Sequence, residues 1–105
     1  MRTQEDEFLT TNHIRGETWT LLRHRTDHRT ARNFVEDITR SPRTRIVFVT
    51  EDAEDEALRW LLRHDERPYS FVDATSFAVM RQLRIDEAMT FDSDFTAAGF
   101  RILPA

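Results

Sequence analysis

Two aspartates at expected element boundaries are the residues of this sequence best placed to do chemistry. Asp73 lies three residues after Ser70, which begins an expected helix, and Asp92 directly follows the apolar run at residues 88–91, which predicts a strand. Carboxylates gathered at one place repel each other, and Mg²⁺ or Mn²⁺ resolves that repulsion because these ions prefer oxygen ligands. Such a site supports metal-assisted hydrolysis of a phosphodiester. Both aspartates also suit helix capping, worth about 1 kcal/mol each, and the local pattern alone favours capping.

A third acidic residue lies on a helical pattern at residues 12–26. Glu17 shares a face of this helix with His13, and taken alone it is an ordinary exposed helix acid. Gly16 precedes it and weakens the helix by roughly 1 kcal/mol relative to Ala, which indicates close packing or a bound group nearby. The pattern therefore leaves both a structural and a functional interpretation of Glu17 open.

The other patterns predict the elements that must position these acids. A helix at residues 28–39 should form an antiparallel hairpin with the first helix, because only the boundary residue Thr26 and Asp27 connect them. Residues 45–49, RIVFV, are the clearest buried strand, and a helix capped by Thr50 follows to about residue 64. The inward residues of that helix are expected to be Ala57, Leu58, Leu61 and Leu62. Strands alternating with helices predict an α/β fold with three layers and a mainly parallel sheet, and ligands bind beyond the carboxyl ends of such strands.

Length and composition fit a single domain over residues 1–105. The chain has no Cys, which excludes disulfides and thiolate metal sites, and its two Gly exclude both glycine-rich nucleotide fingerprints. It contains no apolar run of membrane length and no signal peptide, so a soluble protein that is not exported is expected.

The charge is unevenly distributed along the chain. The net charge is −4 and all fifteen basic residues are Arg. Residues 12–45 contain eight Arg and four acids, whereas residues 46–105 contain six Arg and twelve acids. An acidic site beside a basic flank suits a nuclease that holds cations and attracts a nucleic-acid backbone. Two solvated helix faces would give the same pattern.

Three segments carry a resemblance to a known family. VDATSFAVMRQL, followed by EAMTFDSDFTAAGF, resembles the end of a PIN-domain ribonuclease, in particular the VapC-type toxins of bacterial toxin–antitoxin pairs. LTTNHIRGETWTLLRHR resembles the second strand and following helix of that family. The resemblance implies a three-layer α/β/α PIN-like domain that hydrolyses RNA with Mg²⁺ or Mn²⁺ in the cytoplasm, and an antitoxin protein as partner.

The resemblance also implies roles for single residues. Glu17, Asp73 and Asp92 match the acidic positions of the family's metal site, and Asp94 is a weaker candidate because its counterpart is often not acidic. Two polar residues are expected to support the ligands without binding the metal themselves: Asn12 and Ser76.

One departure from the family pattern lies at the beginning of the chain. The family starts with a hydrophobic strand that ends in an aspartate and lies between the second and fourth strands, but this chain starts with MRTQEDEF, which predicts a mobile end and no such strand. An N-terminally truncated domain with unpaired sheet edges is expected to form homo-oligomers. Two hypotheses follow: a ribonuclease toxin lacking its first strand, or a catalytically impaired remnant that acts as an interaction or antitoxin-binding module.

Overall fold

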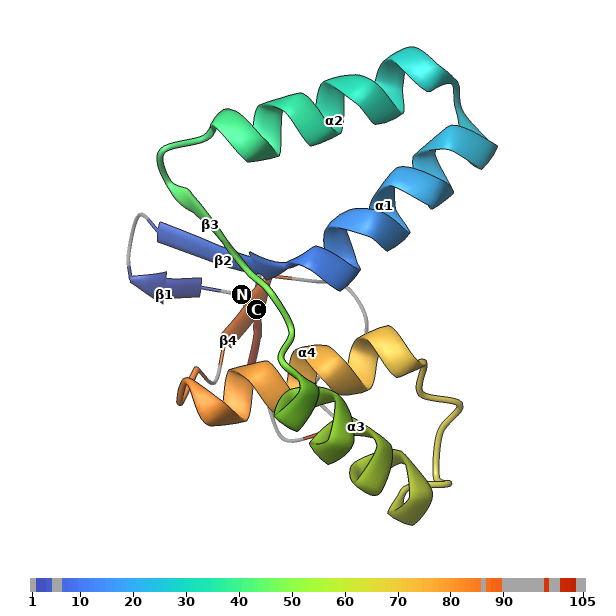
Figure 1. Ribbon diagram of the computed structural model, residues 1–105, viewed down its shortest axis with the longest axis vertical. Helices are drawn as coiled ribbons and strands as arrows, with labels where there is room; N and C mark the ends of the chain where they lie inside the picture. The colour runs from blue at the N-terminus through green and yellow to red at the C-terminus, as the bar shows by residue number, and fades with distance from the viewer. Residues whose placement is uncertain (1, 5–6, 86, 90–97, 99–100, 104–105) are drawn as a thin grey trace.

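The computed structural model has helices on both sides of its strands (Figure 1). It describes residues 2–4, 7–85, 87–89, 98 and 101–103. The upper helices in Figure 1 are α1 (Asn12–Arg25) and α2 (His28–Arg40), and the lower ones are α3 (Glu51–Arg63) and α4 (Phe71–Gln82). This arrangement confirms the predicted three-layer α/β/α domain, and the helix boundaries lie within two residues of those expected from the sequence.

The strands pair mainly in parallel, as predicted. β2 (Glu7–Thr11) runs parallel to β3 (Thr44–Val47), with Thr11 opposite Val47. β4 (Glu87–Met89) runs parallel to β5 (Arg101–Leu103). Residues 90 and 91 of the strand expected at 88–91 lie outside the described residues. The helical turns expected from residue 93 onward, with Asp92 as their cap, lie outside the described residues.

The start of the chain corrects one expectation. Arg2–Gln4 form a strand, β1, which pairs antiparallel with β2 and also contacts β4. It thus covers the edge of β2 that was expected to be unpaired, although β4 forms a separate two-stranded sheet with β5. Hydrogen bonds between strand backbones do not require apolar side chains, so a polar segment can pair with β2. Because only two residues connect β1 to β2, the two strands must run antiparallel.

Each helix begins at a side chain that accepts a hydrogen bond from the backbone N–H three residues later. These N-cap residues are Thr11, Asp27, Thr50 and Ser70. The caps predicted at Thr50 and Ser70 are therefore confirmed. The first turns of α1, α3 and α4 lie close together, since His13 on α1 contacts Glu54 on α3 and the ring of Phe71 on α4.

The core lies mainly between α3 and α4. All residues of α4 from Ala74 to Met80 are buried, which makes it the central helix of the domain rather than one with a single covered face. From α3, Ala53, Ala57 and Trp60 face inward at i, i+4 and i+7. The two alanines let the helices approach closely, because they carry only a methyl group.

Two predicted core positions are wrong. Leu58 and Leu62 lie on the outer side of α3, and Leu62 is 87% exposed. The segment 45–49 is not buried throughout, because β3 ends at Val47 and the next residue, Phe48, is 64% exposed. In both cases the apolar residues lie on more than one face of the helix or strand. The elements packed against it determine which of these faces is buried.

Candidate functional site

The region where β2 and β3 end and the helices begin is held together by side-chain to backbone hydrogen bonds. Thr11, buried at the end of β2, caps α1 by accepting from the N–H of Ile14 at 3.1 Å. Asn12 Oδ1 accepts a 2.8 Å hydrogen bond from the N–H of Val49, in the connection between β3 and α3. These bonds fix the start of α1 against the start of α3.

Glu17 on α1 and Asp73 on α4 are close enough for their charges to interact. The pKa of Glu17 is raised above its ordinary value, first because the carboxyl is partly desolvated and second because the charge of Asp73 disfavours its ionised form. α1 and α4 are in contact, although they are far apart in the sequence. The charges of two of the three predicted acids thus interact, whereas their convergence on one metal ion stays a prediction.

Asp73 also caps its own helix. Its Oδ2 accepts from the N–H of Ser70 at 3.2 Å, and its own N–H donates to Ser70 Oγ at 3.0 Å, which is a complete capping box. An ionised carboxylate offers about four lone-pair sites. The capping role and a role toward a cation are therefore compatible, and the cap holds the carboxylate in a defined orientation.

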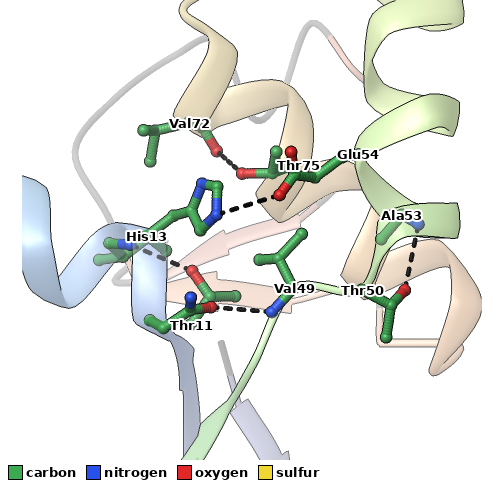
Figure 2. Close-up of polar contacts among 10 residues, drawn as sticks. Thr11, His13, Val49, Thr50, Ala53, Glu54, Val72 and Thr75 are labelled. Atoms are coloured by element: carbon green, nitrogen blue, oxygen red, sulfur yellow. Dashed lines mark hydrogen bonds and ion pairs between the residues drawn. The ribbon is translucent and has the colours of Figure 1, made fainter.

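Two side-chain hydrogen bonds on the buried side of α4 stabilise its first turn. The hydroxyls of Thr75 and Ser76 both donate to the carbonyl of Val72, at 2.8 and 3.0 Å (Figure 2 shows the bond from Thr75). Both side chains are buried. Ser76 therefore does not point at the acids; it acts on them only through the turn that carries Asp73.

His13 connects three helices beside the two acids, and the sequence did not single it out for this role. Its Nε2 lies 3.6 Å from Glu54 Oε1 on α3, as Figure 2 shows, and its ring lies 5.9 Å from the ring of Phe71, the first residue of α4. His13 is one turn before Glu17 on the same face of α1. That spacing was the only signal in the sequence.

Asp92 and Asp94 lie outside the described residues. Among the residues that the structure does describe, no group of three or more His, Asp or Glu side chains could hold a metal ion. The pair Glu17 and Asp73 nevertheless suits a hard divalent cation, because oxygen donors are what Mg²⁺ and Mn²⁺ prefer and because a cation would relieve the repulsion between them.

Gly16 corrects another expectation. A Cβ at this position would meet nothing within 4 Å in the described structure, so close packing does not explain the glycine. The alternative interpretation, a bound group that approaches the helix here, stays a prediction.

Comparison with known proteins places this geometry in a family. The sequence matches the PIN domain family over residues 1–101. The chain belongs to the PIN domain family.

The relatives specify the branch of the PIN family. The chain is 56% identical over 92 residues to the 23S rRNA-specific endonuclease VapC20 of Mycobacterium tuberculosis, in strains H37Rv and CDC 1551, and the match covers 88% of this chain and 70% of the relative. The crystal structure of M. tuberculosis VapC20, described as a sarcin–ricin loop cleaving toxin, superposes with a TM-score of 0.86 at 54% identity, covering 92% of this chain and 74% of that one.

The predicted function class is confirmed by these matches: the chain is a PIN-domain ribonuclease of the VapC toxin type. The alternative, a remnant that serves only as an interaction module, is not favoured. None of the helices in the described part of the PIN domain has the length and hydropathy of a membrane span.

Proposed function

We propose that this chain is a metal-dependent endoribonuclease that cleaves the sarcin–ricin loop of 23S rRNA. The substrate is inferred from VapC20, because 56% identity over most of the chain is high enough for the RNA-contacting surface to be similar. The metal dependence is inferred from the acidic pair. The observation that supports it is the placement of Glu17 and Asp73 on two helices in contact, where a cation would relieve the repulsion that the charge of Asp73 exerts on Glu17.

We assign the metal-site role to Glu17, Asp73 and Asp92, with Asp94 as an outer supporting residue. Mg²⁺ or Mn²⁺ bound there would supply an activated water and a positive charge against the scissile phosphate. Glu17 and Asp73 must both be ionised to bind the cation. The raised pKa of Glu17 means that this condition is reached at a higher pH than for a free glutamate.

The neighbouring residues position these carboxylates. Asn12 holds the first turn of α1 through its 2.8 Å bond to Val49. Ser76 and Thr75 hold the first turn of α4 through the carbonyl of Val72. His13 sets the spacing between α1, α3 and α4. Rigid support of this kind matters, because a displacement of about 1 Å in a catalytic group can cost roughly a hundredfold in rate.

The biological setting is proposed on the same basis. The protein acts as one PIN-like domain over residues 1–105 in the cytoplasm, with an antitoxin protein as its inhibitory partner. Homo-oligomer formation remains part of the proposal, although β1 now covers one edge of β2. The exposed leucines on the outer side of α3, Leu58 and Leu62, are the described surface that favours it.

The test is cleavage of a synthetic RNA hairpin with the sarcin–ricin loop sequence, in Mg²⁺, in Mn²⁺ and in EDTA. Glu17→Gln and Asp73→Asn should each reduce cleavage at least a hundredfold, whereas the same changes in two acids of α2, Glu36→Gln and Asp37→Asn, should leave it unchanged. Circular dichroism should show all four variants folded. Cleavage that survives EDTA and both site variants would refute the mechanism; cleavage of an unrelated RNA only would refute the substrate.

A further inference from the structure

One aromatic side chain at the site's edge of the sheet is exposed, and an arginine lies over its ring. Phe48 is 64% exposed, and the guanidinium carbon of Arg15 is 5.6 Å from its ring centroid. Arg81 lies over Trp60 in a similar way, but Trp60 is in the core and Arg81 is paired with Glu56. Of these two cation–aromatic pairs in the described structure, only Phe48 with Arg15 is open to solvent.

The position of this pair relates it to the acidic site. Phe48 directly follows Val47, the last residue of β3, and Val47 lies opposite Thr11, the residue that caps α1. Arg15 is in the first turns of α1, on the side of the helix away from His13 and Glu17. The Asn12 to Val49 hydrogen bond joins the two segments. Phe48 and the acids therefore flank the start of α1 at the same edge of the sheet.

The chemistry of the pair suits a nucleic-acid base. Proteins recognise unpaired RNA by stacking splayed bases on aromatic rings and on the planar guanidinium of Arg. Arg15 makes no ion pair with any described carboxylate, so its charge is available to a phosphate. It also belongs to the basic segment, residues 12–45, which contains eight Arg and four acids. A lone exposed leucine such as Leu62 offers neither a ring nor a charge.

We propose that Phe48 and Arg15 form a stacking subsite for an unpaired base of the RNA substrate, next to the phosphodiester that is cut. The inference rests on the proposed function and deepens it by assigning a base-binding surface outside the acidic cluster. The base stacks on the face of the Phe48 ring, and the guanidinium of Arg15 binds the adjoining phosphate. The acids on the other flank of α1 then meet the scissile bond.

The experiment measures single-turnover cleavage of the sarcin–ricin hairpin by the full chain at increasing protein concentration. Phe48→Ala should raise the half-saturating concentration about fivefold to a hundredfold, because one base stack is lost, with the maximal rate within about twofold. Phe48→Tyr and Phe48→Trp keep a stacking face and should bind as the unchanged protein does. Arg15→Ala should weaken binding and lower the slope of log affinity against log salt by about one.

A matched control and a direct probe separate stacking from other effects. Leu83→Ala removes another exposed apolar side chain, at the C-cap of α4, and should change nothing in binding or cleavage. A 2-aminopurine in the loop of the hairpin should report a stacking signal at one position, lost in Phe48→Ala and retained in Phe48→Tyr.

Two results would overturn the inference. One is an unchanged half-saturating concentration in Phe48→Ala. The other is a loss that coincides with dissociation of an oligomer in light scattering while the 2-aminopurine signal persists, which would mean that a second copy covers Phe48. If the unchanged protein does not cut the hairpin at all, the proposed function fails first, and fluorescence anisotropy with the same RNA decides the stacking subsite separately.

Discussion

Glu17 on α1 and Asp73 on α4 lie on helices in contact, and desolvation of the Glu17 carboxyl together with the charge of Asp73 raises the pKa of Glu17. We therefore predict that the Glu17 carboxyl titrates above a free glutamate in the metal-free protein, and that Asp73→Asn lowers its midpoint without restoring the free value, because desolvation remains. Carbon-13 NMR of the side-chain carboxyl measures this directly. A midpoint that does not move in Asp73→Asn would show that the two groups do not interact.

The raised pKa of Glu17 also predicts that the stability of the protein depends on pH. A carboxyl whose pKa is raised in the folded state is destabilising when ionised, so its cost is absent at low pH and appears as the pH rises through that raised pKa. Glu17→Gln should therefore raise the melting temperature at neutral pH and leave it unchanged below the ordinary glutamate pKa. Calorimetry across this range is the measurement. Equal stabilisation at both pH values would point to a cause other than charge.

Divalent metal should stabilise the fold through the same pair. Mg²⁺ or Mn²⁺ that binds only the folded protein adds about 2.7 kcal/mol to the free energy of unfolding at a concentration of one hundred times its Kd. We expect the melting temperature to rise with either ion in the unchanged protein and in Glu36→Gln, and not in Asp73→Asn. A Zn²⁺ response without any Mg²⁺ response would contradict a site made of carboxylate oxygens.

His13 is expected to act as a positioning residue through Glu54 and Phe71. His13→Ala should reduce the maximal cleavage rate by about tenfold to a hundredfold with little change in RNA binding, because the spacing of the acids changes. Glu54→Gln should reduce it less, and the double variant should be no worse than His13→Ala, since both act through one contact. Additive losses would show that the two residues work independently. Phe71→Leu tests the ring contact in the same assay.

Replacement of Gly16 by alanine is predicted to stabilise the fold. Because an added Cβ meets nothing within 4 Å of the described atoms, Gly16→Ala should raise the free energy of unfolding by about 0.8 to 1 kcal/mol, the difference in helix propensity. Urea denaturation measures it. A matched change at an exposed position of the same helix, Thr20→Ala, should give a smaller gain. If Gly16→Ala stabilises the chain yet weakens RNA binding, the substrate approaches α1 at this residue.

Much of the fold was predictable because it depends on interactions between residues close together in the sequence. The caps at Thr50 and Ser70, and the capping box that includes Asp73, involve side chains and N–H groups three residues apart. Helical periodicity sets the bounds of the four helices in the same local way. The α/β class and the parallel pairing of β2 with β3 follow from the alternation of helices and strands.

The sequence alone therefore determined the helices, two of their four caps, the fold class and the identity of the candidate acids. Only the tertiary structure decided the rest: that Arg2–Gln4 pair with β2, that Leu58 and Phe48 face outward, and that His13 reaches Glu54. A sequence pattern shows which residues share a face of one element. Which neighbour covers that face depends on contacts between segments far apart in the chain, and the proximity of Glu17 to Asp73 is a contact of that kind.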